Sequence, residues 1–210
     1  MYKIDATIIN EGLRLEASLD LPADATGPWP GVVLCHPHPA YGGDMHNNVV
    51  MALSWALTEL GIVCLRYNSR GVGRSQGYFG GGEPELTDGR AALAFLLAQE
   101  QVDRNRVGII GYSFGASIAL PLGGENEQIK AIAAVSPVIP RGALADCVKP
   151  KMIILGDSDA MIPSAAMLKG SQRMSDPKII KVYPGMDHFW WGAEEEAAKE
   201  IGTFMLENLK

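Results

Sequence analysis

The sequence predicts an α/β fold in which a mostly parallel sheet is covered by helices on both faces. Short, continuously apolar runs, of the kind buried on both sides of a parallel sheet, recur along the chain. Segments with helical periodicity separate these runs, and such strand–helix alternation implies right-handed crossovers between parallel strands. The opening segment differs, because it alternates apolar and polar residues as an antiparallel hairpin does.

Each element follows from its local pattern. The hairpin is expected from Lys3–Ile9 and Leu13–Leu21, with Asn10-Glu11-Gly12 as the turn. The strands expected after it are Gly31–Cys35, Ile62–Tyr67, Arg106–Gly111, Lys130–Val135, Met152–Leu155 and Lys178–Tyr183. The helices expected between them are Asn47–Leu60, Leu86–Gln99, Phe114–Leu122, Ala165–Met174 and Glu194–Asn208. No linker or repeat interrupts this pattern, so residues 1–210 are expected to form a single domain.

Composition narrows the class of protein. Of the 210 residues, 47% are hydrophobic and 20% charged, and the net charge of −6 comes with no basic cluster. The sequence therefore lacks the electrostatic signature of a nucleic-acid partner or of attraction to anionic membranes. Three cysteines without a CxxC pair argue against a disulfide framework. A cytoplasmic location is expected, because neither a signal-peptide pattern nor a membrane-length apolar run is visible.

The strongest chemical signal is Gly111-Tyr112-Ser113-Phe114-Gly115, which follows an apolar strand and opens an apolar helix. A serine on such a sharp strand-to-helix turn projects its Oγ above the sheet, and the flanking glycines let the turn close. The helix N-terminus adds positive potential near a developing oxyanion. This context predicts that Ser113 is a nucleophile of the α/β-hydrolase type, rather than part of a turn that merely caps the helix.

A serine at its ordinary pKa is a weak nucleophile and needs a general base. In this architecture the chain order is Ser, then Asp or Glu, then His, and His188 is the only histidine after Ser113. It lies in the loop after the last expected strand, where an imidazole can reach over the sheet. We therefore predict His188 as the base.

The acid that orients the imidazole should follow a strand between the serine and the histidine. The segment Ile153-Ile154-Leu155-Gly156-Asp157-Ser158-Asp159 offers two candidates. We favour Asp159, which lies further out in the loop, and keep Asp157 as the alternative. Asp187 is adjacent to His188 in sequence and is interpreted as a solvated turn carboxylate.

An oxyanion hole requires N–H donors aimed at the position where negative charge develops. The backbone N–H of Phe114, directly after the nucleophile, is one expected donor. The loop after Gly31–Cys35 reads His36-Pro37-His38-Pro39, and its prolines have no N–H to donate. The backbone N–H of His38 is therefore the second expected donor.

Several segments together resemble a known family. His36–Pro39, Tyr41–Met45 and Asn47–Val50 look like the start of compact α/β-hydrolases related to dienelactone hydrolases, a group with a His-Pro-His-Pro signature. Leu65–Ser75, Gly111–Gly115, Gly156–Asp159 and Asp187–Phe189 are similar to the same group in the same order. The resemblance implies Ser113, Asp159 and His188 as the catalytic triad, with an oxyanion hole at His38 and Phe114. It departs in two respects: dienelactone hydrolases use a cysteine nucleophile, and Pro137–Pro150 is too short for the helical cap of many relatives.

Other readings of these residues are weaker. His36, His38, Asp44 and His46 could form a metal cluster, but the prolines already explain a rigid loop, and no metal site is expected. Gly71-Val72-Gly73 does not continue into a dinucleotide-binding GxGxxG pattern. Pocket walls are expected from Tyr41, Met161 and Phe189, although the Phe189-Trp190-Trp191 run is first of all expected to pack the closing helix.

The function predicted from the sequence is hydrolysis of an ester or thioester of a small or accessible acyl group, through an acyl-enzyme intermediate. No cofactor is required, the partner is a small-molecule substrate, and a homodimer is compatible with an exposed sheet edge. A dienelactone-type or carbon–carbon hydrolase is one alternative. A hydrolase-like scaffold that only binds a partner is the other, because fold does not fix function.

Overall fold

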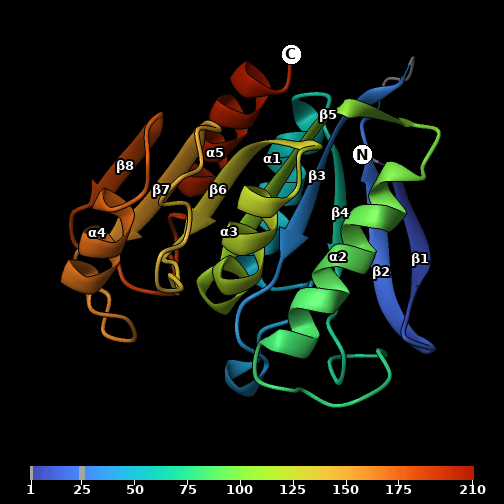
Figure 1. Ribbon diagram of the computed structural model, residues 1–210, viewed down its shortest axis with the longest axis horizontal. Coiled ribbons are helices and arrows are strands. Elements are labelled where there is room, and N and C mark those ends of the chain that lie inside the picture. The colour runs from blue at the N-terminus through green and yellow to red at the C-terminus, as the bar shows by residue number, and fades with distance from the viewer. Residues whose placement is uncertain (1, 24–26) are drawn as a thin grey trace.

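The computed structural model describes residues 2–23 and 27–210 and contains one eight-stranded sheet (Figure 1). The strand order is β1-β2-β4-β3-β5-β6-β7-β8. The hairpin strands β1 and β2 pair antiparallel, and β2 joins the rest of the sheet antiparallel to β4. All other neighbouring strands are parallel. The predicted α/β-hydrolase fold, with its N-terminal antiparallel hairpin, is confirmed.

The elements lie close to the expected ranges. The strands are β1 (Tyr2–Asn10), β2 (Leu13–Leu21), β3 (Trp29–Cys35), β4 (Val63–Tyr67), β5 (Val102–Tyr112), β6 (Ile129–Val135), β7 (Lys151–Gly156) and β8 (Lys178–Tyr183). The helices are α1 (Asn48–Glu59), α2 (Glu83–Leu97), α3 (Ala116–Glu125), α4 (Ser164–Gln172) and α5 (Glu194–Asn208), with short 3-10 turns η1 (Pro39–Tyr41) and η2 (Ser113–Gly115). Among the described residues, no helix is both long enough and apolar enough to span a membrane.

Two apolar layers hold the helices against the sheet. Helices α1 and α5 cover one face, where Leu53, Leu57 and Ile201 are among the buried residues. Helices α2, α3 and α4 cover the other face, seen in front of the sheet in Figure 1, with Leu96 and Ile118 in its core. Both faces of the inner parallel strands are thus buried, which explains their continuous apolar runs, whereas the edge strand β8 is partly exposed.

Several boundaries differ from the sequence-based expectation; β5, for example, begins at Val102 rather than Arg106. The starts of α2 and α3 are the two that bear on the site. Helix α2 begins at Glu83 rather than Leu86, because the carboxylate of Glu85 accepts hydrogen bonds from the N–H groups of Gly80 and Gly82 and stabilises an earlier first turn. The helix after Ser113 begins as the 3-10 turn η2 and becomes regular at Ala116. No helix or strand lies between β6 and β7, so the sheet carries no cap there.

The order of the strands places the loops after β3 and β5 next to each other. Chain connections run from β3 to β4 in one direction across the sheet and from β5 to β6 in the other. In open α/β sheets, ligands bind in the crevice that such a reversal opens outside the carboxyl ends of the strands. Strands β3 and β5 pair directly up to Cys35 and Gly111, so residues 36–38 and 112–114 meet at this crevice.

A buried ion pair joins the hairpin to the parallel strands. The Arg66 guanidinium on β4 donates hydrogen bonds to both carboxylate oxygens of Asp20 on β2, and both side chains are almost fully buried. Asp20 also accepts from Ser18 and Ser54, and Arg66 donates to the carbonyl oxygen of Met45. Every charged atom therefore has partners, which buried charges require.

Removal of one member of this pair should cost much of the protein's stability. We expect Arg66→Met to lower the free energy of unfolding by about 3–5 kcal/mol, because Asp20 is left buried without its counter-charge. The double variant Asp20→Leu/Arg66→Met should be less destabilised than Arg66→Met alone, because it removes both charges. Urea denaturation followed by circular dichroism measures both; equal losses in the two variants would contradict this account.

Candidate active site

Ser113 directly follows β5 and is the first residue of η2, on the sharp turn between strand and helix. Its φ of 54° is in the left-handed region, a conformation that costs a residue with a side chain roughly 1–3 kcal/mol. The flanking glycines permit this turn: a Cβ on Gly115 would overlap the carbonyl oxygen of Cys35, and one on Gly111 would lie 2.5 Å from Cα of Ala116. The turn thus needs glycine on both sides because the backbones approach so closely.

The structure brings Ser113, His188 and Asp159 into one hydrogen-bonded chain. Nε2 of His188 lies 2.9 Å from Oγ of Ser113, and Nδ1 lies 2.7 Å from Oδ2 of Asp159. Each residue is at most 8% exposed. The residues follow β5, β8 and β7 respectively, so three strand ends supply one site. Their catalytic roles stay predictions.

The surroundings of Asp159 determine which nitrogen of His188 carries the proton. Oδ1 of Asp159 accepts from the N–H groups of Met161 and Ile162, at 2.9 and 2.8 Å, which holds the carboxylate in place. Because a carboxylate only accepts hydrogen bonds, Nδ1 of His188 must be the protonated nitrogen. Nε2 then carries the lone pair, which accepts the hydroxyl proton of Ser113.

Asp157, the alternative acid, has a different set of partners. Its Oδ1 accepts from the N–H of Gly185 at 2.7 Å and from the hydroxyl of Ser158 at 2.9 Å. It therefore ties the loop after β7 to the loop after β8, rather than contacting His188. Asp187 accepts from the N–H groups of Phe189 and Trp190 and forms a local turn, as interpreted from the sequence.

The two expected oxyanion donors lie at the same crevice. The loop containing His38 follows β3, and Phe114 follows Ser113 on the neighbouring β5, with the rings of His38 and Phe114 5.1 Å apart. Neither backbone N–H donates to another residue within the described parts of the chain. Both are thus free to bind an anionic oxygen, the property that an oxyanion hole needs.

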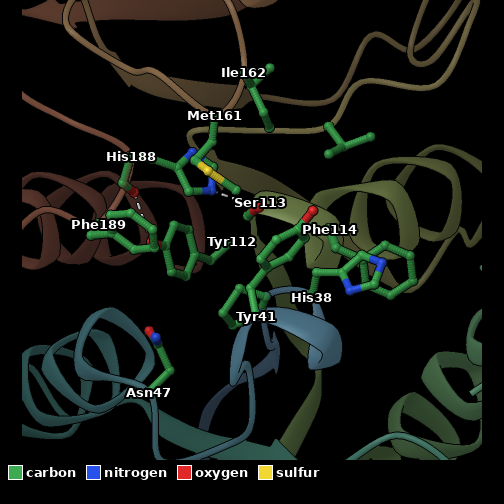
Figure 2. A pocket seen from close by; sticks show the side chains of 12 residues that line it. His38, Tyr41, Asn47, Tyr112, Ser113, Phe114, Met161, Ile162, His188 and Phe189 are labelled. Carbon is green, nitrogen blue, oxygen red and sulfur yellow. Dashed lines mark hydrogen bonds between the residues drawn. The ribbon is translucent and has the colours of Figure 1, made fainter.

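A cleft with a volume of about 180 Å³ opens above Ser113 (Figure 2). Tyr41, Met161 and Phe189, the expected wall residues, all line it. The sequence analysis did not find the other lining residues: Pro37, Asn47, Tyr112, Val138 and Ile162. Most of these are apolar, and no Asp or Glu among the described residues lines the cleft.

Tyr112 is the most informative of the residues that were missed. Its hydroxyl donates to the carbonyl oxygen of His188 at 2.8 Å, and its ring stacks on the imidazole at a centroid distance of 5.8 Å. Burial and the nearby charge of Asp159 raise the pKa of its hydroxyl, which therefore remains protonated and able to donate. Its position next to Ser113 in the sequence could have indicated that it lies at the site. Its hydrogen-bond partner, the carbonyl oxygen of His188, could not be predicted from the sequence.

His36 is engaged in the protein interior. Its Nε2 accepts from the N–H of Ser69 at 3.1 Å, so the protonated Nδ1 donates to the carbonyl oxygen of Pro37 at 2.7 Å. Burial lowers the pKa of this imidazole, which keeps it neutral. Both ring nitrogens are occupied, in agreement with the interpretation of His36 as a packed loop residue rather than a metal ligand.

The three aromatic residues after His188, Phe189-Trp190-Trp191, lie in three different environments. Trp190 is fully buried, packs against Tyr183 and donates from Nε1 to Oγ of Ser136 at 3.0 Å. Trp191 is 70% exposed, whereas Phe189 faces the cleft. The expected packing role therefore applies to Trp190 alone.

The chain has the α/β-hydrolase fold. A serine that is hydrogen-bonded to a histidine lies at the carboxyl ends of the parallel strands. Together, these two features are typical of an α/β serine hydrolase. Residues 11–148 match the family described as X-Pro dipeptidyl-peptidase (S15 family), and the chain belongs to this family. The relation to dienelactone hydrolases that was read from the sequence is not part of this match.

Several proteins are similar to this chain over most of its length. An uncharacterised protein of Rickettsia prowazekii is 36% identical over 197 residues, which cover 88% of this chain and 82% of that protein. A serine hydrolase homologue from Coxiella burnetii is 30% identical, with a TM-score of 0.82 and coverage of 99% and 97% of the two chains. A serine hydrolase without lid from Xanthomonas campestris is 27% identical, with a TM-score of 0.87 and coverage of 99% and 95%.

Proposed function

We propose that the protein hydrolyses an ester or thioester bond of a small acyl group, with Ser113 as nucleophile. The observation that carries this proposal is the hydrogen-bonded chain from Asp159 through His188 to Ser113. This chain ends at the floor of an open apolar cleft. The geometry matches the requirements for activating a serine: a base within hydrogen-bond reach and an acid that orients the base.

Acylation begins when Nε2 of His188 takes the Ser113 proton while Oγ attacks the carbonyl carbon. The carbonyl π electrons move to oxygen, and the N–H groups of His38 and Phe114 bind the resulting oxyanion. The negative Asp159 stabilises the imidazolium. As the tetrahedral intermediate collapses, the bond to the leaving oxygen or sulfur breaks, and His188 transfers its proton to that atom.

Deacylation repeats these steps with water. His188 removes a proton from a water molecule, whose oxygen attacks the acyl-enzyme carbonyl. Collapse of the second intermediate breaks the bond to Ser113, and the serine oxygen recovers a proton from His188. The carboxylic acid leaves, and the protonation states at the start are restored.

The cleft favours small acyl groups. Its volume of about 180 Å³ is below the roughly 300–1,000 Å³ of pockets that enclose drug-sized ligands. No helix lies between β6 and β7 to cover a long chain. A long neutral acyl chain would leave part of its apolar surface in water and gain little binding free energy.

The family name refers to dipeptidyl-peptidase activity, and the cleft is less suited to that reaction than to ester or thioester hydrolysis. A dipeptidyl-peptidase must hold the free ammonium of its substrate, and a buried ammonium needs a carboxylate partner. The residues lining the cleft include no Asp or Glu, and Asp159 beneath it is already bonded to His188. Ester or thioester hydrolysis requires no such partner.

A fluorophosphonate probe tests the proposal without knowledge of the natural substrate. Ser113 should attack the phosphorus and expel fluoride, so that intact mass shows one adduct on the wild type. Ser113→Ala should show none, and Ser117→Ala, which removes a nearby helical hydroxyl, should label as the wild type does. Absence of an adduct on folded wild type would overturn the proposal and favour a binding scaffold. A panel of esters, thioesters and lactones then separates the proposed reaction from dienelactone-type chemistry.

A further inference from the structure

A second depression continues from the catalytic cleft. It has a volume of about 710 Å³ and lies between residues 137–145, which follow β6, and helix α4. Val138 and Ile162 line both this groove and the cleft. The N–H of Val138 donates to the carbonyl oxygen of Ser113 at 3.0 Å, so the groove begins directly beside the nucleophile.

Three cations line this groove: Arg141, Lys169 and Arg173. All three are exposed, and no Asp or Glu contributes to the lining. Most other Lys and Arg side chains form a salt bridge with a carboxylate or donate a hydrogen bond to a backbone carbonyl. Within residues 2–23 and 27–210, these three cations form neither kind of interaction. In a chain with a net charge of −6, this is a local concentration of unpaired positive charge.

The groove is apolar where it meets the cleft, and two of its cations lie further along α4. Ile139 and Ala166 belong to the lining between the shared residues and the cations. Because an α-helix rises about 1.5 Å per residue, Lys169 and Arg173 lie roughly 8 and 14 Å along α4 from Ser164. The groove therefore matches an aliphatic arm that ends in an anion.

The groove starts on the side from which the leaving group departs. The leaving atom must receive its proton from Nε2 of His188. Met161 lies beside His188, and Ile162 follows it at the start of the groove (Figure 2). Tyr41 and Asn47, which also line the cleft, lie on the opposite side of Ser113 (Figure 2), so that side is left for the acyl group.

We propose that the substrate of this hydrolase has a small acyl group and a leaving alcohol or thiol whose aliphatic arm ends in a carboxylate or phosphate. Arg141, Lys169 and Arg173 bind that anion, and the apolar part of the groove contacts the arm. This inference rests on the proposed function, because it assigns the leaving group that is released from the carbonyl carbon when Ser113 is acylated.

The test compares S-acetyl thioesters of mercaptoalkanoic acids, graded in length, with their neutral primary amides. At the best length, the carboxylate should be preferred by about tenfold in kcat/KM, which corresponds to about 1.4 kcal/mol. Three exposed charge pairs can contribute this much together after screening. The preference should shrink as the salt concentration rises. S-Acetyl mercaptoalkyl phosphates, measured alongside, distinguish a phosphate terminus from a carboxylate.

Two triple variants with the same change in net charge provide the comparison. Arg141→Ala/Lys169→Ala/Arg173→Ala should abolish the preference, and turnover of the neutral amides should remain. Arg14→Ala/Arg104→Ala/Lys199→Ala removes two arginines and one lysine outside the groove and should keep the preference. All six side chains are exposed, so both proteins are expected to fold, which circular dichroism verifies.

Equal turnover of charged and neutral thioesters by the wild type would overturn the inference and leave the proposed function intact. So would a preference that survives in the groove variant. Nitrophenyl monoesters of dicarboxylic acids carry the anion on the acyl side, and a preference confined to them would overturn the assigned orientation. Turnover of none of these compounds would overturn the proposed function itself.

Discussion

His188→Ala is expected to lower kcat for an activated ester by about 10⁶-fold, as loss of the base does in other serine hydrolases. Nε2 of His188 is the group bonded to Oγ of Ser113, and without it no base takes the hydroxyl proton. The residual rate should come from the oxyanion donors and substrate binding alone. Initial rates with nitrophenyl acetate measure the loss.

A matched control separates this effect from the general loss of an imidazole. His46 is exposed at the start of α1, and its side chain has no part in the hydrogen-bonded chain. His46→Ala should therefore keep the wild-type rate. Comparable rates for His188→Ala and the wild type, with both proteins folded, would show that Ser113 is activated differently or not at all.

Asp159→Asn should lower kcat by about 10⁴-fold without unfolding the protein. An asparagine oxygen can still accept from Met161 and Ile162, so the loop keeps its shape. Its NH₂ group, however, would face Nδ1 of His188 and force that nitrogen to accept. The ring proton then moves to Nε2, where it blocks the lone pair that Ser113 requires.

Asp157→Asn is the matched comparison, because the two carboxylates are two residues apart. The asparagine oxygen at position 157 can keep the hydrogen bond from Gly185, so turnover should change only slightly. Steady-state kinetics with one ester, and melting temperatures of both variants, measure the difference. The reverse ranking of the two variants would contradict the assignment of Asp159.

The sequence predicted those features that depend on local patterns. Apolar runs and helical periodicity located the strands and helices, because burial on both faces of a sheet leaves a continuous apolar sequence. Ser113 was recognisable because a strand–turn–helix with flanking glycines has a narrow structural meaning. His188 followed from chain order, and the structure places it beside Ser113.

Contacts between residues that are far apart in the sequence could not be predicted from such local patterns. The hydrogen bond from Tyr112 to the carbonyl of His188 joins residues 76 positions apart. The buried pair of Asp20 and Arg66 joins strands separated by 46 positions. The groove could not be predicted from sequence either, because Arg141 and Lys169 come to line one groove only in the folded chain.

The absence of regular structure between β6 and β7 has a consequence for how this protein could change. Ser113, Asp159 and His188 all follow other strands, namely β5, β7 and β8. Residues 137–145 form one wall of the groove and supply none of the three. Val138 in that wall donates its N–H to the carbonyl oxygen of Ser113, but residues 139–145 lie beyond it. Mutations or insertions in residues 139–145 can therefore alter which molecules are accepted while Ser113, Asp159 and His188 stay in place. This part of the groove is therefore open to evolve independently of the three residues.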